Sequence, residues 1–358
     1  MRKFLALLAA AVLVFAFAAC GAPEEEQPEE QIDYEIALVT DAGLIMDGGY
    51  SEVAWNAISE FGASEGVSHK YYKAAEATEE AYMATIDNAV SRGAKVIVAD
   101  GDSFSSAVYK AQETYKDVKF VLIDAEPMNE ETGKSKIDKN TTIIEFASEQ
   151  AGFLAGYGAV KDGFTQLGFM GAAKTPSMMD YGYGFLQGAD RAAQENGVNV
   201  NVNYHYCSKK EDRTAILDRA TAWYNAGTEV IFACGTQLEL PVIESAELTD
   251  KKVIAFETDK SGMSDTVVTS AVKDIDTALE TILKQYKDDE FPGGTTVKYN
   301  AANEGIWLEL ENGKLENLSK GVYEEAYDEL ANNNAAVKRY NSGDIASLGL
   351  ANVAVSEQ

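Results

Sequence analysis

The chain is poor in the residues that most catalytic and metal sites need. Its 358 residues include only two histidines, His69 and His205, and three cysteines. It has no Gly-rich phosphate loop ending in Lys-Ser/Thr, no Gly-x-Ser-x-Gly, no His-Glu-x-x-His and no Cys-x-x-Cys. His69 precedes a strand-like run among polar residues and His205 lies within one, so both are expected to be structural or solvated. We therefore expect no metal, no cofactor and no enzymatic activity.

Positive charge is also scarce. The sequence has 58 acidic side chains against 30 basic ones, a formal net charge of −28, and the acidic excess is spread along the chain. Nucleic acid is excluded as a partner, because its binding depends on cationic side chains that neutralise phosphates. With 46% hydrophobic residues, a chain of this length can bury a sizeable core and form two domains.

Only the N-terminus carries a long apolar run. Residues 1–20, MRKFLALLAAAVLVFAFAAC, start with basic residues and continue apolar to Ala19, as in a secretory signal. The run is shorter than the roughly 20 residues of a membrane-spanning helix. FAACG at 17–21 resembles the bacterial lipobox, which predicts lipidation of Cys20 at the extracytoplasmic face of the cell membrane. The alternative is a cysteine that only ends the signal peptide. The acidic residues 21–33 predict a flexible tether.

The other two cysteines, Cys207 and Cys234, each follow or end a strand-like run. If these strands flank the strand LGFMG (167–171), the cysteines lie two strand spacings apart, about 9.5 Å, which is beyond the reach of a disulfide. We expect both to be free and to have no catalytic role.

Strand-like and helix-like runs alternate along the rest of the chain. The segments between the strands, such as 50–62, 79–91 and 105–115, carry apolar residues at helical spacing. This alternation predicts an α/β fold of doubly wound parallel sheets. The strand-like runs are YEIALVT, HKYYKA, AKVIVAD, KFVLIDA, TTIIEF, QLGFMG, VNVNYHY, EVIFACG, KVIAFET and TVVTSAV.

The strand series starts twice, over residues 34–146 and 165–270, which predicts two similar lobes joined by hinge strands. A helix at 274–287 and a helical run at 323–343 follow. The carboxyl ends of the strands in both lobes would line a cleft, which is where open α/β sheets bind ligands. We assign to lobe one residues 34–146 plus about 273–291, and to lobe two residues 147–272 plus about 292–358.

Acidic residues follow several of the strand-like runs. Any one of them is more often a helix cap or a turn former than a ligand contact. Converging from several strands, carboxylates can accept hydrogen bonds from the paired hydroxyls of a sugar. The set comprises Asp41, Asp47, Asp100, Asp102, Asp124, Glu257 and Asp259.

Tyrosines occupy comparable positions in the two lobes. Tyr50 follows the first strand of lobe one, and Tyr181, in DYGYGF, follows the first strand of lobe two. If the two rings face each other, they form a clamp for a planar base. Helix-start packing is the plainer explanation for the neighbouring Tyr183 and Phe185.

Several of these segments, taken in order, resemble the basic membrane protein family, the purine-nucleoside-receptor lipoproteins of ABC importers. They are LVTDAGLIMDGGYSEVAWNAI, KFVLID, ASEQAGFLAGYGA, LGFMGA, PSMMDYGYGFLQGAD, KVIAFETDK and VVTSAVKD, within residues 34–310. The resemblance implies a type I periplasmic-binding-protein fold that captures a purine nucleoside (inosine, guanosine or adenosine). It also implies delivery to a membrane permease driven by a separate ATPase, and a monomer suits such a receptor.

The resemblance also assigns site residues. It implies that Tyr50 and Tyr181 stack on the base, where the family has Phe, and that Glu257 holds the ribose hydroxyls near Lys273. Glu257 replaces the family's Asp, so Asp259 is the alternative ribose contact. The remaining matches are Asp47, Ser51 in place of Asn, and Asp100 and Asp102 in the region that contacts the base.

Two other functions remain open. The same fold could bind a free sugar or a signalling molecule, because a sugar needs at most one apolar face covered. An extracellular nucleoside hydrolase would need a metal-binding Asp cluster or an acid–base pair, which the scattered carboxylates do not specify.

Overall fold

The computed structural model describes residues 33–43, 45, 49–208, 210–333, 335–340 and 343–358. All the described residues belong to one compact unit, residues 33–358. The predicted signal peptide, the predicted lipidation site Cys20, most of the predicted tether and Asp47 therefore lie outside the described residues. None of the helices in the described part is both long enough and apolar enough to cross a membrane.

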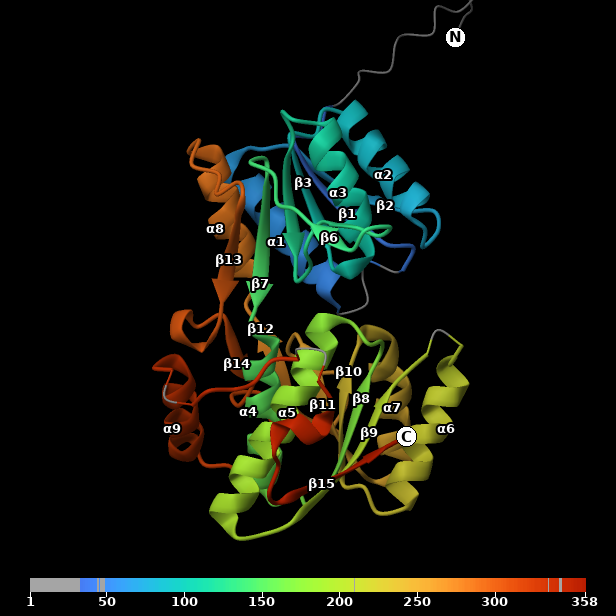
Figure 1. Ribbon diagram of the computed structural model, residues 1–358, viewed down its shortest axis with the longest axis vertical. Coiled ribbons are helices and arrows are strands. Elements are labelled where there is room, and N and C mark those ends of the chain that lie inside the picture. The colour runs from blue at the N-terminus through green and yellow to red at the C-terminus, as the bar shows by residue number, and fades with distance from the viewer. Residues whose placement is uncertain (1–32, 44, 46–48, 209, 334, 341–342) are drawn as a thin grey trace, which may run out of the picture. The chain divides into compact units, whose positions relative to one another are not determined.

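The first sheet has six strands in the order β13-β7-β4-β3-β1-β2, all parallel (Figure 1). Alternate residues of β1 face opposite sides: Leu38 enters a core with α1 and α8, and Val39 enters another with α2 and α3. The sheet is therefore covered on both faces, as predicted. Its elements are β1 (Ile36–Thr40), α1 (Tyr50–Glu65), β2 (His69–Lys73), α2 (Glu79–Ser91), β3 (Val96–Asp100), α3 (Ser105–Thr114), β4 (Lys119–Ile123), β7 (Thr141–Phe146), α8 (Ile275–Lys287) and β13 (Thr295–Tyr299).

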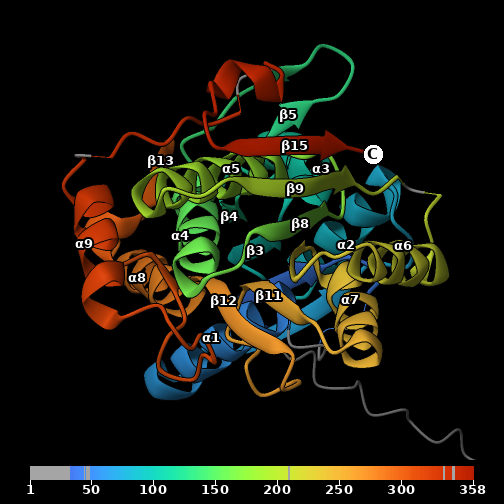
Figure 2. The same cartoon turned by 90° about the horizontal axis from the view of Figure 1, so that it is seen from below.

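The second sheet has seven strands in the order β14-β12-β11-β10-β8-β9-β15, and only the pair β12–β14 is antiparallel. Helices α4 and α5 pack on one face of it, and α6 and α7 on the other. Figure 2 shows β15 lying along β9. The elements are α4 (Ser148–Asp162), β8 (Gln166–Gly171), α5 (Pro176–Asn196), β9 (Val200–Tyr206), α6 (Arg213–Asn225), β10 (Val230–Cys234), α7 (Thr236–Thr249), β11 (Lys252–Glu257), β12 (Val267–Lys273), β14 (Ile306–Leu308), α9 (Lys320–Ala331) and β15 (Val353–Glu357).

A few short elements complete the described chain. They are the antiparallel ribbon β5 (Met128–Asn129) and β6 (Lys134–Ser135), and the 3₁₀-helices η1 (Asp102–Phe104), η2 (Ala301–Asn303) and η3 (Ile345–Leu348).

The α/β class and all ten predicted strands are confirmed. The chain passes between the two sheets after β7, after β12 and after β13. The predicted return to lobe two near residue 292 is too early, because β13 still pairs with β7 of the first sheet. We call the first sheet with α1, α2, α3 and α8 the first lobe, and the second sheet with its helices the second lobe.

The predicted helical run at 323–343 is also too long, since α9 ends at Ala331. Asn333 adopts a left-handed backbone conformation with φ 55°, which ends the helix. Asparagine tolerates this conformation better than most residues, and its side chain competes with the backbone for hydrogen bonds.

The two remaining cysteines behave as expected. Cys207 and Cys234 are buried and free, and β9 and β10 flank β8.

Glycines in ASEQAGFLAGYGA let α4 and α5 touch backbone to backbone. A Cβ at Gly152 or Gly156 of α4 would overlap the carbonyl oxygens of Tyr181 and Phe185 on α5. Gly184 and Gly188 of α5 meet α4 in the same way. This close contact fixes the position of α5, whose N-terminal turns carry residues of the site described below.

Gly156→Ala is expected to lower the free energy of unfolding by about 1 to 3 kcal/mol, because the added methyl group forces the helices apart. The control is Gly321→Ala, at an exposed position in α9 with no atom near the added Cβ. It should be neutral or stabilise by about 0.4 to 1 kcal/mol. Urea unfolding measures both, and equal stabilities would contradict the packing account.

Candidate functional site

A buried lysine joins the two lobes where strand carboxyl ends meet. Lys273, the last residue of β12, places Nζ 2.6 Å from Asp124 Oδ2 of the first lobe and 3.4 Å from Glu257 Oε1. Ser177 Oγ, at the start of α5, lies 3.5 Å from the same nitrogen. These four residues form what we call the Lys273 cluster.

Two carboxylates of the Lys273 cluster stand on unusual backbone. Asp124 has φ 53° and Glu257 has φ 64°, in the left-handed region that residues with a side chain rarely adopt. Such conformations concentrate at functional sites, because the surrounding structure must hold them. Asp124 is held by the Phe146 N–H, which donates to its Oδ1 at 2.8 Å.

The protonation states follow from burial and from these contacts. Burial lowers the pKa of Lys273, but Asp124, Tyr181 and Glu257 outweigh it and raise that pKa well above its usual value, so the lysine is charged. Burial raises the pKa of Glu257 despite the opposing effect of Lys273. Burial, and then the charge of Glu257, raise the pKa of Asp100 well above its usual range. The site therefore combines a charged lysine with two carboxyl groups, Glu257 and Asp100, whose pKa values lie above their usual range.

A second buried ion pair, Lys260 with Glu239, holds the backbone next to Glu257 in place. Lys260, which contacts the Glu239 carboxylate, also donates to the Phe256 carbonyl oxygen at 3.2 Å. Glu239 Oε1 accepts the Phe256 N–H at 3.2 Å, and both partners of the pair are buried. These bonds fix the end of β11, from which Glu257 projects.

The two predicted stacking tyrosines both reach this region. Tyr50 is 6% exposed and Tyr181 is fully buried. Neither hydroxyl has a hydrogen-bond partner among the described residues. Burial, followed by the charges of Asp124, Asp100 and Glu257, raises the pKa of Tyr50 well above its usual value. A buried hydroxyl without a partner is costly and is therefore uncommon.

The predicted clamp requires one face of the Tyr181 ring to be free for a base, but in the structure this ring is covered on all sides. Its ring packs edge-on against Phe232 at 5.8 Å and Phe256 at 6.0 Å, and Lys273 Nζ lies 4.8 Å from its centroid. The reason is that α5 lays this ring against its own sheet. A base could stack on Tyr181 only after a rearrangement.

The other predicted site residues fall in two different places. Ser51 donates to Asp100 Oδ2 at 3.3 Å, so these two are together. Asp259 is exposed and accepts from Ser261 N and from Asn312 Nδ2 at 3.0 Å, away from the Lys273 cluster. Of the two alternatives for the ribose contact, only Glu257 lies in the cluster.

A cavity of about 240 Å³ opens beside the Lys273 cluster, between residues of both lobes. Arg339, which lines it, contacts Glu145 of β7 and donates through Nε to Asp180 of α5 at 2.9 Å. The lining also includes Asp102, Ser105, Asp124, Phe146, Ser148, Pro176 and Ser177.

Sequence reasoning missed Ser177 and Arg339. Ser177 stands beside the predicted Tyr181 at the start of a helix, and this position was the available signal. Arg339 lies in a stretch predicted to be helical, and nothing in its neighbourhood pointed to a ligand site.

Two doubly wound lobes, three chain crossings, and a buried polar cluster at facing strand ends define the fold of the type I periplasmic binding proteins. A family model described as "ABC transporter substrate-binding protein PnrA-like" matches residues 35–342. The chain belongs to this family, Bmp, which confirms the resemblance seen in the sequence.

The chain is also similar to individual proteins. The chain is 26% identical over 307 residues to the "ABC transporter nucleoside-binding protein BmpA" of Lactococcus lactis, covering 79% of this chain and 84% of that protein. It is 28% identical to the "Transcriptional activator protein med" of Bacillus subtilis, covering 66% and 69%. The fold is similar to an ABC transporter solute-binding protein from Aeropyrum pernix, with a TM-score of 0.67 and 18% identity, covering 84% and 86%.

Proposed function

We propose that this chain binds a purine nucleoside between its lobes, at the Lys273 cluster, and delivers it to an ABC permease driven by a separate ATPase. The observation that carries the proposal is the pair of buried tyrosine hydroxyls without partners, Tyr50 and Tyr181, beside a charged lysine and two carboxylates. Unpartnered polar groups of this kind suit a site that a polar ligand completes. The nucleoside-binding relative from Lactococcus lactis supports the choice of ligand.

The binding energy has identifiable sources. Glu257 accepts hydrogen bonds from the ribose diol, each worth about 1.5 to 3 kcal/mol because the acceptor is charged. Stacking on Tyr50 contributes about 1 to 3 kcal/mol for one base face, and on Tyr181 a similar amount if its ring rearranges. Micromolar affinity, about −8 kcal/mol, is within reach of these contributions.

Nucleosides should bind better than their monophosphates. Asp100, Asp102, Asp124 and Glu257 give the site an acidic surround, and a phosphate would meet it in a partly dry environment. In competition with a radiolabelled nucleoside, the monophosphate should be at least about tenfold weaker. Equal potency would contradict this placement of charge. Recovery of the nucleoside intact from the same mixture tests the expectation that the chain has no hydrolase activity.

We also propose that Cys20 carries the lipid that holds the chain at the extracytoplasmic face of the cell membrane. Cys20→Ser should move the chain from the membrane fraction to the soluble fraction, because the lipid would be the anchor. The control is Cys234→Ser, which removes a buried thiol elsewhere in the chain. Membrane retention of the Cys20→Ser chain would contradict lipid anchoring.

One observation favours a free sugar as an alternative ligand. Tyr181 has no exposed surface and Tyr50 is 6% exposed, so of the two rings only Tyr50 has any surface to offer an apolar face. A sugar needs no second ring and would use the same carboxylates. Ribose therefore belongs in every binding experiment as a separate arm.

A further inference from the structure

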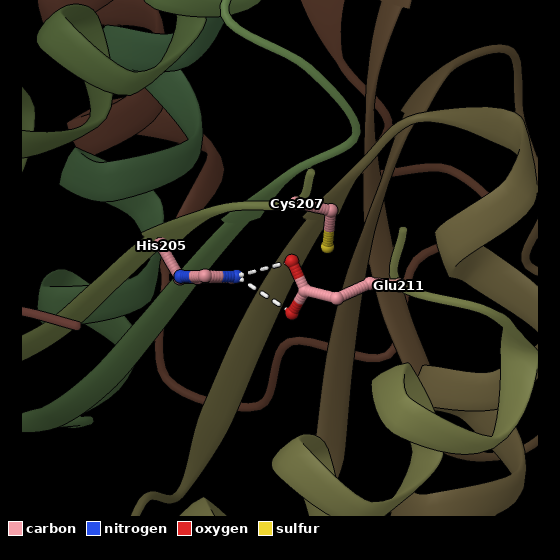
Figure 3. Close-up of side chains that lie close together, drawn as sticks. All are labelled: His205, Cys207 and Glu211. Carbon is pink, nitrogen blue, oxygen red and sulfur yellow. Dashed lines mark hydrogen bonds and ion pairs between the residues drawn. The ribbon is translucent and has the colours of Figure 1, made fainter. Parts of the chain in front are cut away.

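Three side chains of metal-binding type meet at the edge of the second lobe (Figure 3). His205 and Cys207 are two residues apart at the end of β9, and Glu211 follows in the loop before α6. Their nitrogen, sulfur and oxygen atoms all lie within 4.8 Å of one another. His205 is 8% exposed and Cys207 9%. The group lies beside β15, several strands away from the Lys273 cluster.

The hydrogen bonds of His205 determine what its second nitrogen can do. Nδ1 lies 2.6 Å from the main-chain oxygen of Gln358, which can only accept, so Nδ1 carries a proton and donates it. Nε2 lies 3.0 and 3.3 Å from the two carboxyl oxygens of Glu211. Both carboxyl oxygens of Glu211 also accept hydrogen bonds from donors of the protein, one from the Ser208 N–H and one from Arg219. The carboxylate can only accept, so Nε2 either holds a second proton or shares a cation with Glu211.

The spacing fits a cation. Zinc binds histidine nitrogen and carboxylate oxygen at about 2.0 to 2.2 Å, so two such ligands at a tetrahedral angle stand about 3.4 Å apart. The separations of 3.0 and 3.3 Å are close to this value. A cysteine sulfur within reach adds a ligand that zinc prefers over magnesium or calcium.

The outer contacts resemble those of metal sites. Metal-binding histidines usually donate their other N–H to a carbonyl or carboxylate, as His205 does to Gln358. Glu211 is oriented by the Ser208 N–H at 2.7 Å and by Arg219 Nη2 at 2.8 Å. Arg219 is the one charge in this group that opposes a cation. Each carboxyl oxygen accepts only one of these two bonds and keeps a lone pair free.

We propose that His205, Cys207 and Glu211 form a binding site for one zinc ion, with a fourth position open to a small ligand. The ion would tie the end of β9 to the loop before α6 and, through His205, to Gln358 after β15. The site is independent of nucleoside binding.

Cobalt titration of the purified full chain, stripped of metal with a chelator, tests this proposal. We expect one equivalent of Co²⁺ to produce a thiolate-to-cobalt absorption band that Zn²⁺ abolishes by displacement. Cys207→Ser should remove the band and weaken Zn²⁺ binding at least tenfold. Cys234→Ser, at the other buried cysteine, should leave both unchanged.

Three results would overturn the proposal. One is the absence of stoichiometric binding together with a doubly protonated His205 by NMR, which would make the group a histidine–glutamate ion pair. Another is Zn²⁺ binding that is unchanged in Cys207→Ser and Glu211→Gln, which would place the metal elsewhere on the acidic surface. The third is loss of the band in Cys234→Ser alone.

Discussion

Lys273→Met should lower the free energy of unfolding by about 3 to 5 kcal/mol at neutral pH. The substitution keeps most of the side-chain volume but removes the buried cation that pairs with Asp124 and Glu257. Both carboxylates then remain in a poorly solvated site without a countercharge, and this is the costly outcome for a broken buried pair. Urea unfolding of the variant and the natural chain measures the difference.

The loss of stability in Lys273→Met should depend on pH. Without Lys273, the pKa of Glu257, which burial already raises, rises further in the folded state, so the folded chain takes up a proton as the pH falls. Stability held by such groups is present at low pH and is lost as the pH rises through their folded-state pKa. The deficit should therefore be smaller near about pH 5 than near about pH 8.

Lys95→Met is the matched control, because Lys95 is exposed. It should change stability by less than about 0.5 kcal/mol. A Lys273→Met chain as stable as the Lys95→Met chain would show that the Lys273 cluster does not hold the lobes as described.

Glu257→Gln should weaken nucleoside binding about 10- to 100-fold, whereas Asp259→Asn should change it less than about twofold. The two residues lie two positions apart, and the sequence left either one as the ribose contact. In the structure Glu257 is buried beside Lys273, and Asp259 is exposed and bonded to Asn312. Calorimetry on both variants measures the difference.

Thermal unfolding of both variants shows whether a loss of binding reflects a loss of fold. If Asp259→Asn has the larger effect on affinity while both remain folded, the ribose contact is Asp259, and the orientation of Glu257 has another purpose.

The sequence predicts most of the scaffold because hydrophobic periodicity is a local property. Runs such as AKVIVAD and KFVLIDA carry β-branched residues between turn formers, and both are strands. The edge strand β13 was not predicted. Its residues, TTVKY, are mostly exposed or only partly buried, so they lack a strong apolar pattern. The lobe boundary therefore moved from about 292 to a point after Tyr299.

The sequence predicts the site only in part, because the direction of a side chain depends on tertiary packing. Strand-end reasoning correctly placed Asp124 and Glu257 in one region, since the carboxyl ends of parallel strands share an edge, whereas Lys273 came only from the family resemblance. The direction of Tyr181 depends on how closely α5 approaches its sheet and α4, and only the structure gives this. Arg339 reaches the cavity from a segment far along the chain, which no local pattern could indicate.

Isothermal titration calorimetry of the purified chain against guanosine, inosine, adenosine, cytidine and ribose tests the central claim most directly. We predict one-to-one binding of at least one purine nucleoside at micromolar concentration or below, with ribose at least about tenfold weaker. No binding of any nucleoside, or ribose bound as tightly as the best of them, would contradict the assignment.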